Sequence, residues 1–241
     1  MKKHLKKVMQ SSPIADHFIN LFIELYVAFV HKMNVLKCRR TYKKKKRLKI
    51  NFGSGSATKP GFLNLDFSSS ADMRLDLRKP IPLVDASCYF VYSEHFVEHL
   101  SYPEGVELHF SECFRILESG GEISISVPDA EWPLVEYAEG KRSYLETCEQ
   151  QKWHPEDCLT FMEHINYHFR QRWRGGSYSH FGNHRFAWDF ETMEKKLAEF
   201  GFVDIERRYY DPKLDSKHRE IGSLFVKAYK PITGDNDNAL L

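Results

Sequence analysis

The spacing of hydrophobic and polar residues changes once along this chain, from a helical repeat to a series of short apolar runs. Residues 14–31 repeat with the period of about 3.6 residues that is typical of an amphipathic helix. From residue 48 onward, brief apolar runs end at glycine, proline or acidic residues, which is typical of buried strands separated by turns. The pattern predicts strands at 48–52, 62–66, 72–75, 88–93 and 122–127, helices at 101–117 and 190–200, and a closing antiparallel pair at 202–210 and 223–229.

This alternation of strands and helices predicts an α/β fold with a mostly parallel sheet and helices on both faces. Residues 1–47 are expected to form a basic helical leader, and residues 48–230 the domain itself. Within the domain, residues 130–186 break the alternation with closely spaced aromatic residues and histidines, so we expect an inserted cap there. The glycines at 120–121 are expected to end the preceding helix, and residues 231–241 to form a flexible tail.

The predicted leader helix is apolar over most of its circumference. A single polar arc holds Asp16, His17, Asn20, Glu24 and His31. The longest unbroken apolar run falls well short of the roughly 20 residues of a membrane-spanning helix. We therefore expect the apolar face to pack on protein, either on the chain's own domain or on the second copy of a homodimer. The alternative is peripheral membrane contact through residues 14–49, whose basic side chains would lie on acidic headgroups.

Charge is distributed unevenly between the leader and the domain. Residues 1–50 hold 14 basic residues and two acids, whereas residues 51–241 hold 21 basic and 31 acidic residues. Such a leader favours an anionic partner, either a lipid surface or nucleic acid. The acidic domain would repel phosphate, and no RNA-binding module is recognisable. Nucleic acid is therefore not an expected partner.

Cysteine usage indicates the cytoplasm. The five cysteines are scattered and include no C-x-x-C pair, a pattern that fits reduced thiols. The basic start of the chain resembles that of a signal peptide, but Pro13, Asp16 and Asn20 interrupt any apolar continuation. We expect a cytoplasmic protein, placed at the inner face of the membrane if the leader binds lipid.

Two glycines and one aspartate make up the strongest chemical signal. The first strand of the domain runs into Gly53 and Gly55, and the second ends at Asp66. Glycine lets the backbone approach a ligand closely, and a carboxylate at the end of the neighbouring strand can accept hydrogen bonds from a ribose diol. Pro60 and Gly61 leave no room for the third glycine and long helix of a dinucleotide site. We expect a nucleoside crevice that does not bind NAD.

An ordered series of short motifs gives the chain a resemblance to a known family. The series comprises residues 51–55, 60–66, 71–77, 80–82, 92–100, 112–117, 120–121 and 125–129. It resembles the class I S-adenosylmethionine-dependent methyltransferases, most closely the small bacterial branch often linked to surface-polysaccharide biosynthesis. The resemblance implies a Rossmann-like sheet that binds S-adenosyl-L-methionine. The chain departs from the family at Ser54, where Cys is usual, and at Asn51, where other branches often have an acid.

The resemblance implies that the glycine loop and the acid of the second strand hold the cofactor. The backbone of Gly53, Ser54 and Gly55 would lie against the methionine moiety. Asp66 would accept both ribose hydroxyls through charge-assisted hydrogen bonds. The alternative role of Asp66 is to cap a turn.

The same resemblance implies contacts at both ends of the cofactor. Asp76, with the backbone of Leu77, would hold the amino edge of adenine, and the alternative for Asp76 is a solvated loop residue. Ser93 and Glu94, at the end of the fourth strand, would line the methionine end near the sulfonium.

Methyl transfer to a hydroxyl benefits from a general base, and three residues are candidates for it. His95 follows the fourth strand, Asp129 follows the fifth, and His184 lies where the cap ends. His95 is best placed, because ligands gather at the carboxyl ends of parallel strands. Its alternative role is that of a structural imidazole. Glu98 and His99, on the following turn, are expected to be structural.

The histidines of the cap raise the question of a metal site. Two pairs show i, i+4 spacing: His154 with Cys158, and His164 with His168. Pro155 would displace His154 from a helix, and the sequence offers no residue to support such ligands. We expect no metal.

The expected activity is methyl transfer from S-adenosyl-L-methionine to an oxygen of a saccharide or another small polar acceptor. The aromatic residues of the cap favour a sugar, because aromatic faces pack against sugar rings. Packing within the cap is their alternative role. An RNA or protein methyltransferase and a non-catalytic cofactor-binding subunit are the alternative functions.

Overall fold

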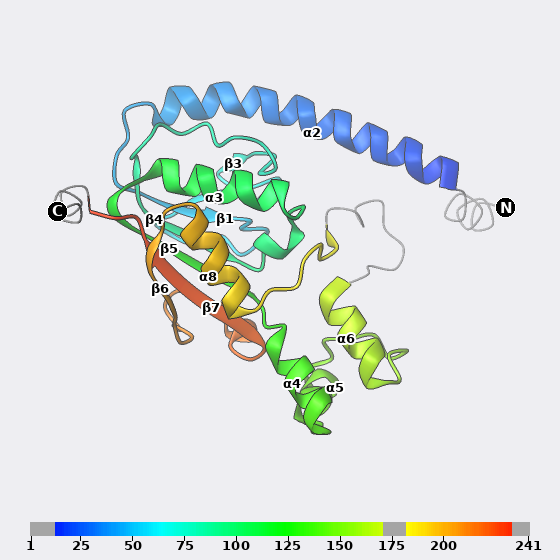
Figure 1. The fold of residues 1–241 in the computed structure, drawn as a ribbon. Coiled ribbons are helices and arrows are strands. Elements are labelled where there is room, and N and C mark those ends of the chain that lie inside the picture. The colour runs from blue at the N-terminus through cyan, green and yellow to red at the C-terminus, as the bar shows by residue number, and fades with distance from the viewer. Residues whose placement is uncertain (1–12, 171–181, 233–241) are drawn as a thin grey trace.

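A seven-stranded sheet forms the centre of the computed structural model, which describes residues 13–170 and 182–232 (Figure 1). Its strands are β1 (Leu48–Phe52), β2 (Leu63–Asp66), β3 (Met73–Arg74), β4 (Cys88–Glu94), β5 (Leu117–Pro128), β6 (Val203–Arg207) and β7 (Ser223–Tyr229). Their order across the sheet is β3-β2-β1-β4-β5-β7-β6. Strands β1 to β5 run parallel, and β7 is antiparallel to both β5 and β6. The predicted sheet and its closing antiparallel pair are confirmed.

The strand order changes direction between β1 and β4. Strands β2 and β3 continue the sheet on one side of β1, whereas β4 and β5 lie on the other. In open α/β sheets, ligands bind outside the carboxyl ends of the strands at such a reversal. The residues that follow Phe52, Asp66 and Glu94 therefore frame the expected crevice.

Two helices lie side by side against the sheet, in front of it in Figure 1. They are α3 (Glu104–Ile116) and α8 (Phe190–Glu199). The ring of Phe110 on α3 lies 6.3 Å from that of Phe200, measured between centroids, and the fully buried Trp188 lies beside Phe110. The apolar faces of both helices thus form one continuous core with the strands.

The helix α3 ends earlier than predicted. Its last residue is Ile116, and β5 begins directly at Leu117. The two glycines at 120–121, which we expected to end the helix, lie inside the strand instead. The pairing of β5 with β4 jumps from Leu117 to Glu122, and Gly120 has a φ of +73° within this gap. The glycines therefore accommodate a bulge in the strand.

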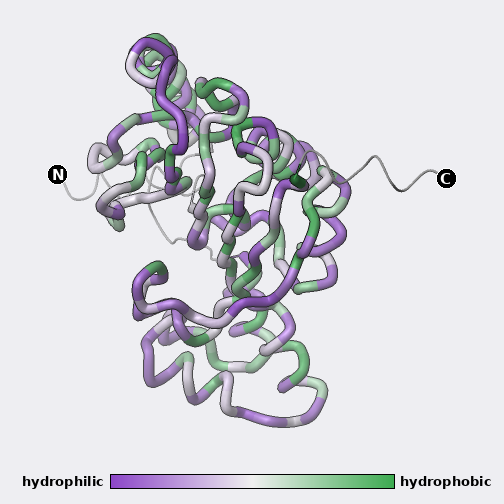
Figure 2. The backbone as a smooth tube through the Cα atoms, turned by 90° about the vertical axis from the view of Figure 1, so that its left-hand side faces the viewer, coloured by the Kyte–Doolittle hydropathy of each residue, from purple (hydrophilic) through white to green (hydrophobic). Residues whose placement is uncertain are grey.

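The segment expected to form a cap contains three helices beyond the carboxyl end of β5. They are α4 (Glu131–Glu139), α5 (Ser143–Gln151) and α6 (Phe161–Arg170). A small core around Tyr144 and Cys148 holds them together. In Figures 1 and 2 the cap lies at the opposite end of the molecule from the N-terminal helix. Residues 171–181 of the predicted cap, and most of the predicted tail at 231–241, lie outside the described residues.

The N-terminal helix, α2 (Pro13–Tyr42), is longer than the predicted segment and packs along β3 at the edge of the sheet (Figure 1). Its polar arc faces the domain. Glu24 accepts two hydrogen bonds from Arg78, at 2.9 and 2.8 Å. His31 accepts one from the backbone amide of Asp76 at 3.1 Å. The first 12 residues of the predicted leader lie outside the described part of the chain.

The apolar side of α2 is exposed along its length. Its large exposed side chains are Phe18, Leu21, Phe22, Leu25, Tyr26, Phe29, Met33 and Leu36. This face does not pack on the chain's own domain, which was one of the two expected options. The opposite side of the helix docks there, through Glu24 and His31 and through Val27 and Cys38. By length and composition alone, the stretch His17–Tyr42 is also suited to crossing a membrane, although it contains no long unbroken apolar run.

Candidate active site

The carboxyl ends of β1 and β2 open into a crevice of about 960 Å³. The start of α3 and one side of α2 complete its walls. Among the expected cofactor residues, Gly53, Asp66, Asp76 and Leu77 line the crevice, and so does His95. The structure therefore brings together the glycine loop, both aspartates and the best-placed candidate base.

Conformation and space both require glycine at position 53. The φ of Gly53 is +65°, in the left-handed region that favours glycine. A Cβ built there would lie 2.5 Å from Cβ and Cγ of Phe96. The amide of Gly53 donates to the carbonyl of Leu65 at 2.9 Å and so holds the loop against β2. A side chain at this position would displace the loop or Phe96.

Asp66 joins the glycine loop to the end of β2. Its Oδ2 accepts from the amide of Gly55 at 3.0 Å, and its Oδ1 accepts from the amide of Ser68 at 2.6 Å. Asp66 therefore caps a turn, which was its alternative role. A carboxylate oxygen can accept a further hydrogen bond, so the same side chain keeps acceptor capacity for a ligand in the crevice.

Asp76 is held by ionic contacts and is not a solvated loop residue. Its carboxylate is 7% exposed and accepts from Nε and Nη2 of Arg78 at 2.8 and 2.9 Å. The same guanidinium binds both oxygens of Glu24 on α2. The hydrogen bond that Arg78 donates to Glu24 is the main cause that raises the pKa of Arg78. This network fastens α2 to the wall of the crevice.

The other four expected cofactor residues do not line the crevice. The amide of Gly55 is used by Asp66, and the buried hydroxyls of Ser54 and Ser93 have no hydrogen-bond partner within the described ranges. The carboxylate of Glu94 accepts from the amide and hydroxyl of Ser216 at 2.7 and 2.6 Å. Successive side chains of a strand point to opposite faces of the sheet, so Ser93 and Glu94 point in opposite directions. Neither side chain lines the crevice.

Sequence reasoning missed that α2 forms part of the crevice. Ile23, Tyr26 and Val27 line it. The ring of Tyr26 meets that of Phe67 edge-on at 5.9 Å between centroids, and the guanidinium of Arg74 lies 4.9 Å from the Phe67 ring. The available signal was the polar arc of α2, whose carboxylate and imidazole required partners on the domain.

His95 adopts a backbone conformation that is rare outside glycine, with a φ of +51°. Such strain is concentrated at functional sites. Nη1 of Arg219 donates to Nδ1 of His95 at 2.8 Å, so the proton of the neutral ring is assigned to Nε2, which donates to Oγ of Ser223 at 2.8 Å. Burial, and then the charge of Arg219, hold the pKa of His95 well below its usual range. The imidazole is therefore neutral, and both of its nitrogens are engaged.

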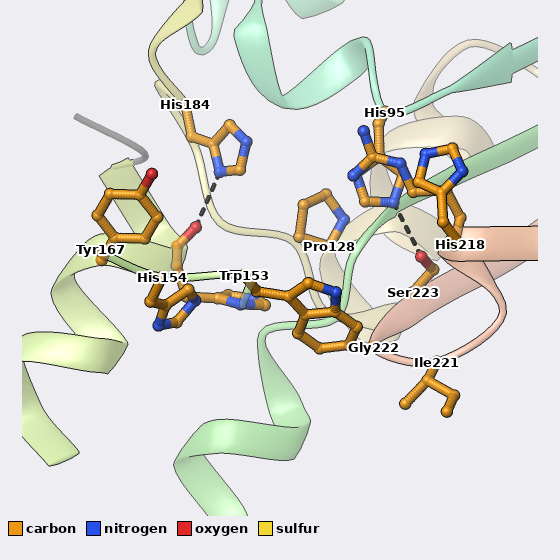
Figure 3. A pocket seen from close by; sticks show the side chains of 12 residues that line it. His95, Pro128, Trp153, His154, Tyr167, His184, His218, Ile221, Gly222 and Ser223 are labelled. Atoms are coloured by element: carbon orange, nitrogen blue, oxygen red, sulfur yellow. Dashed lines mark hydrogen bonds between the residues drawn. The ribbon is translucent and has the colours of Figure 1, made fainter. Parts of the chain in front are cut away.

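A second, smaller cavity of about 190 Å³ lies on the cap side of His95 (Figure 3). Trp153 and Tyr167 of the cap line it together with His184, and residues 218–223 close its far wall. His95 belongs to the walls of both this pocket and the crevice. The two cavities therefore meet at one imidazole.

The other two candidate bases have different surroundings. His184 lines the pocket and donates from Nδ1 to the carbonyl of His168 at 2.8 Å. Burial lowers the pKa of His184 to about 3. Asp129 does not line the pocket. Its Oδ1 accepts from the amide of Glu131 at 2.9 Å and so caps the start of α4. Burial raises the pKa of Asp129.

Glu98, expected to be structural, lies in a ring of histidines. It belongs to the short 3-10 helix η1 (Val97–His99), and its side chain is 1% exposed. Nitrogens of His95, His99 and His184 lie 3.5, 3.8 and 3.9 Å from its Oε1. Burial raises the pKa of Glu98 to about 8. The sequence places two of these histidines next to Glu98, but only the fold brings in His184.

The cap histidines associate differently from the i, i+4 pairs of the sequence. Nδ1 of His154 lies 2.8 Å from Nδ1 of His164, and Nε2 of His154 lies 3.9 Å from Sγ of Cys148. Burial is the main cause that lowers the pKa of His154 to about 3. The contact joins one member of each predicted pair, with Cys148 in place of Cys158.

A comparison with solved structures finds matches of low sequence identity. An S-adenosylmethionine-dependent methyltransferase from Methanosarcina mazei is 13% identical with a TM-score of 0.48, and the match covers 80% of this chain and 96% of that one. One from Archaeoglobus fulgidus is 15% identical with a TM-score of 0.43, covering 83% and 94%. Phosphoethanolamine N-methyltransferase 2 of Haemonchus contortus, solved with phosphomonomethylethanolamine and S-adenosylhomocysteine, is 14% identical with a TM-score of 0.42, covering 83% and 52%.

These likenesses concern the backbone alone. The chain spans about half the length of the Haemonchus enzyme. No protein-family model matches the sequence, and no curated protein matches it either. The strand order and the closing antiparallel pair are those of a Rossmann-like α/β fold. What this chain binds must therefore be argued from its own residues.

Proposed function

We propose that this protein is an S-adenosylmethionine-dependent methyltransferase that acts on an oxygen of a saccharide or another small polar acceptor. The observation that carries the proposal is the position of His95, in the walls of both the crevice and the pocket. Methyl transfer requires donor and acceptor to meet in line at one point. A residue shared by two cavities marks such a point.

The crevice suits S-adenosyl-L-methionine, which supplies an activated methyl group on its sulfonium. Asp66, at the end of β2, keeps acceptor capacity for the ribose hydroxyls. Tyr26 and Phe67 provide aromatic surface for adenine. The loop at Gly53 brings backbone close enough to contact the amino-acid end.

The pocket beyond His95 suits a small polar acceptor. Trp153 and Tyr167 give it aromatic surface, and His168 and His184 add imidazole rings. A sugar presents both an apolar ring face and several hydroxyls, so it can use both kinds of wall. The small volume of the pocket admits one sugar ring or the end of a longer saccharide.

The acceptor proton must leave during transfer to a hydroxyl. The O–CH₃ bond forms as the S–CH₃ bond breaks, and the proton passes to a base or to solvent. Nδ1 of His95 becomes available as that base when the acceptor hydroxyl displaces Arg219, which donates to it here. Until then Arg219 occupies this nitrogen and keeps the imidazole neutral.

The proposal is tested by incubating the protein with S-adenosyl-L-methionine and a panel of saccharides, and following acceptor masses by mass spectrometry. We expect one saccharide class to gain a methyl group, with S-adenosylhomocysteine formed in equal amount. Methylation of only RNA or protein acceptors would contradict the acceptor assignment. Cofactor binding without transfer to any acceptor class would identify a non-catalytic subunit.

We also propose that the enzyme works in the cytoplasm, at the inner face of an anionic membrane. The outward face of α2 carries exposed large apolar side chains from Phe18 to Leu36, while the opposite side docks on the domain. Exposed basic residues lie toward the end of the same helix: Lys32, Lys37, Arg39 and Arg40. An apolar face beside a basic cluster is the pattern of helices that lie in the headgroup region of acidic bilayers.

Vesicle flotation tests this location with two variants. In Phe22→Glu/Phe29→Glu the apolar face gains two charges, and we expect flotation with phosphatidylglycerol vesicles to be lost. Leu159→Glu changes an exposed leucine of the cap and should float like the wild type. Unchanged flotation of the double variant would overturn the membrane assignment. Dissociation of a dimer in that variant, without flotation of the wild type, would assign the face to a homodimer instead.

A further inference from the structure

Glu98 is a buried carboxyl group whose oxygens are not satisfied by protein. Neither Oε1 nor Oε2 has a hydrogen-bond partner within residues 13–170 and 182–232. Its side chain is 1% exposed and so lies away from bulk solvent. Such a group is costly to ionise unless its charge is paired or it coordinates a metal ion, and the guanidinium charge of Arg219 acts on Glu98. The environment of Glu98 therefore calls for a ligand.

Three imidazoles surround the same oxygen at distances too long for hydrogen bonds. Oε1 of Glu98 lies 3.8 Å from Nε2 of His99, 3.9 Å from Nε2 of His184 and 3.5 Å from Nδ1 of His95. Two ligands about 2.1 Å from a zinc ion at the tetrahedral angle are about 3.4 Å apart. The spacing is therefore close to that of atoms that share one ion.

Backbone carbonyls orient two of these rings. Nδ1 of His99 donates to the carbonyl of Asn183 at 3.3 Å, and Nδ1 of His184 donates to that of His168 at 2.8 Å. In the neutral tautomer that results, each ring turns an unprotonated Nε2 toward Glu98. Metal-binding histidines are held in this way, with the second nitrogen donating to a carbonyl or carboxylate.

We propose that Glu98, His99 and His184 bind one divalent first-row transition-metal ion, for which zinc is the natural probe. Two imidazoles and one carboxylate form a donor set that leaves coordination positions open. Their ligating atoms lie within 4.8 Å of one another. No metal was predicted from the sequence, because only the i, i+4 pairs of histidine and cysteine within the cap were considered. These ligands come instead from η1 and from the end of the cap.

The site adjoins the point where the two cavities meet. His99 lines the crevice, His184 lines the pocket, and His95 between them lines both. An ion there would hold the acceptor oxygen and lower the pKa of its hydroxyl. The proton then passes to His95, the O–CH₃ bond forms and the S–CH₃ bond breaks, and the ion is unchanged. This role rests on the proposed function, whereas the binding site itself does not.

Calorimetry on chelator-treated, full-length protein tests the site with Zn²⁺ alone. We expect one ion per chain, and at least a 100-fold loss of affinity in Glu98→Gln and in His184→Phe, more than the roughly 10- to 100-fold cost of losing a supporting residue. The matched control is His154→Phe, in the other cluster with Cys148 and His164, and it should bind Zn²⁺ like the wild type. Cobalt(II) spectra of the wild type should lack a thiolate charge-transfer band.

Each outcome decides the proposal. Absence of stoichiometric Zn²⁺ and Co²⁺ binding to the wild type would overturn it, as would loss of binding in His154→Phe with retention in Glu98→Gln. Circular dichroism shows whether Glu98→Gln has folded, and His184→Phe is the second variant if it has not. Binding of S-adenosylhomocysteine is measured separately. Its failure with Zn²⁺ binding intact would refute the methyltransferase assignment and leave the metal site standing.

Discussion

The two cavities that meet at His95 are built in different ways. The crevice comes mainly from two stretches of chain, residues 53–78 and 95–108, completed by α2 and by Arg185. The pocket comes from segments far apart in the sequence, including the end of β5, the cap and residues 218–223. The motifs that follow β1, β2 and β3 thus mark much of the crevice, whereas no local motif marks the pocket.

The chemistry of the two cavities differs as well. The crevice presents backbone groups and two aspartates, Asp66 and Asp76, each fixed by hydrogen bonds. The pocket presents imidazoles that burial keeps neutral, with the pKa of His168 lowered to about 4. The cofactor side depends on strand ends and a glycine turn, while the acceptor side depends on how the cap packs. Substitutions should therefore affect binding and turnover separately on the two sides.

The sharpest test of this separation is the residue that both cavities share. His95→Asn removes the imidazole but tolerates the left-handed backbone, because Asn is enriched at positive φ. We expect turnover to fall roughly 100-fold or more, the range lost with a general base. Affinity for S-adenosylhomocysteine should change less than about threefold. Equal losses in the methylation assay and in calorimetry would make His95 a binding residue and would erase the distinction.

The glycine turn of the crevice provides a matched pair of variants. In Gly53→Ala the new Cβ meets Phe96 at 2.5 Å, so we expect about 3 kcal/mol or more of destabilisation from overlap and positive φ together. In Gly55→Ala nothing lies within 4 Å, and only the backbone cost of roughly 1–2 kcal/mol remains. Urea unfolding measures both. Similar losses in the two variants would show that Phe96 does not constrain the loop.

A buried imidazole beneath the crevice predicts how stability depends on pH. Burial lowers the pKa of His109 on α3 to about 4. Since the unfolded chain takes up this proton near pH 6.5, the contribution of His109 is complete above that pH and is lost as the pH falls toward 4, by about 3 kcal/mol. His109→Leu should remove this part of the slope in unfolding measured across that range. If the free energy of unfolding depends on pH equally in the wild type and in His109→Leu, a group other than His109 takes up the proton.

Much of the fold could be predicted from the sequence because its signals are local. The strands β1, β2, β4 and β7 and the helix α8 fall within a few residues of their predicted ranges, since apolar runs and glycines mark them directly. The end of α3 lies one residue from its predicted position, but the role of Gly120 and Gly121 was predicted wrongly, because such glycines indicate a helix end and a strand bulge equally well. The side of α2 that packs on the domain was also not predicted correctly. The helical period identifies a polar arc but does not show what that arc contacts.

The candidate site divides along the same line. Gly53, Asp66, Asp76 and Leu77 follow strand ends, and strand topology alone places them in one crevice. The surroundings of Glu98 could not be predicted, because His184 is far from Glu98 in the sequence. It lies beside Glu98 only because the segment that follows the cap packs against η1. The amide of Arg185 donates to the Glu98 carbonyl at 2.7 Å and fixes that segment.

The most direct test of the account is titration of the wild type and Asp66→Ala with S-adenosylhomocysteine in a calorimeter, with NADH as the competing ligand. Charge-assisted hydrogen bonds to two ribose hydroxyls are worth about 1.5–3 kcal/mol each. We therefore predict micromolar binding to the wild type and a loss of at least about 100-fold in the variant. Equal affinity in both proteins, or tighter binding of NADH by the wild type, would contradict the assignment of the crevice.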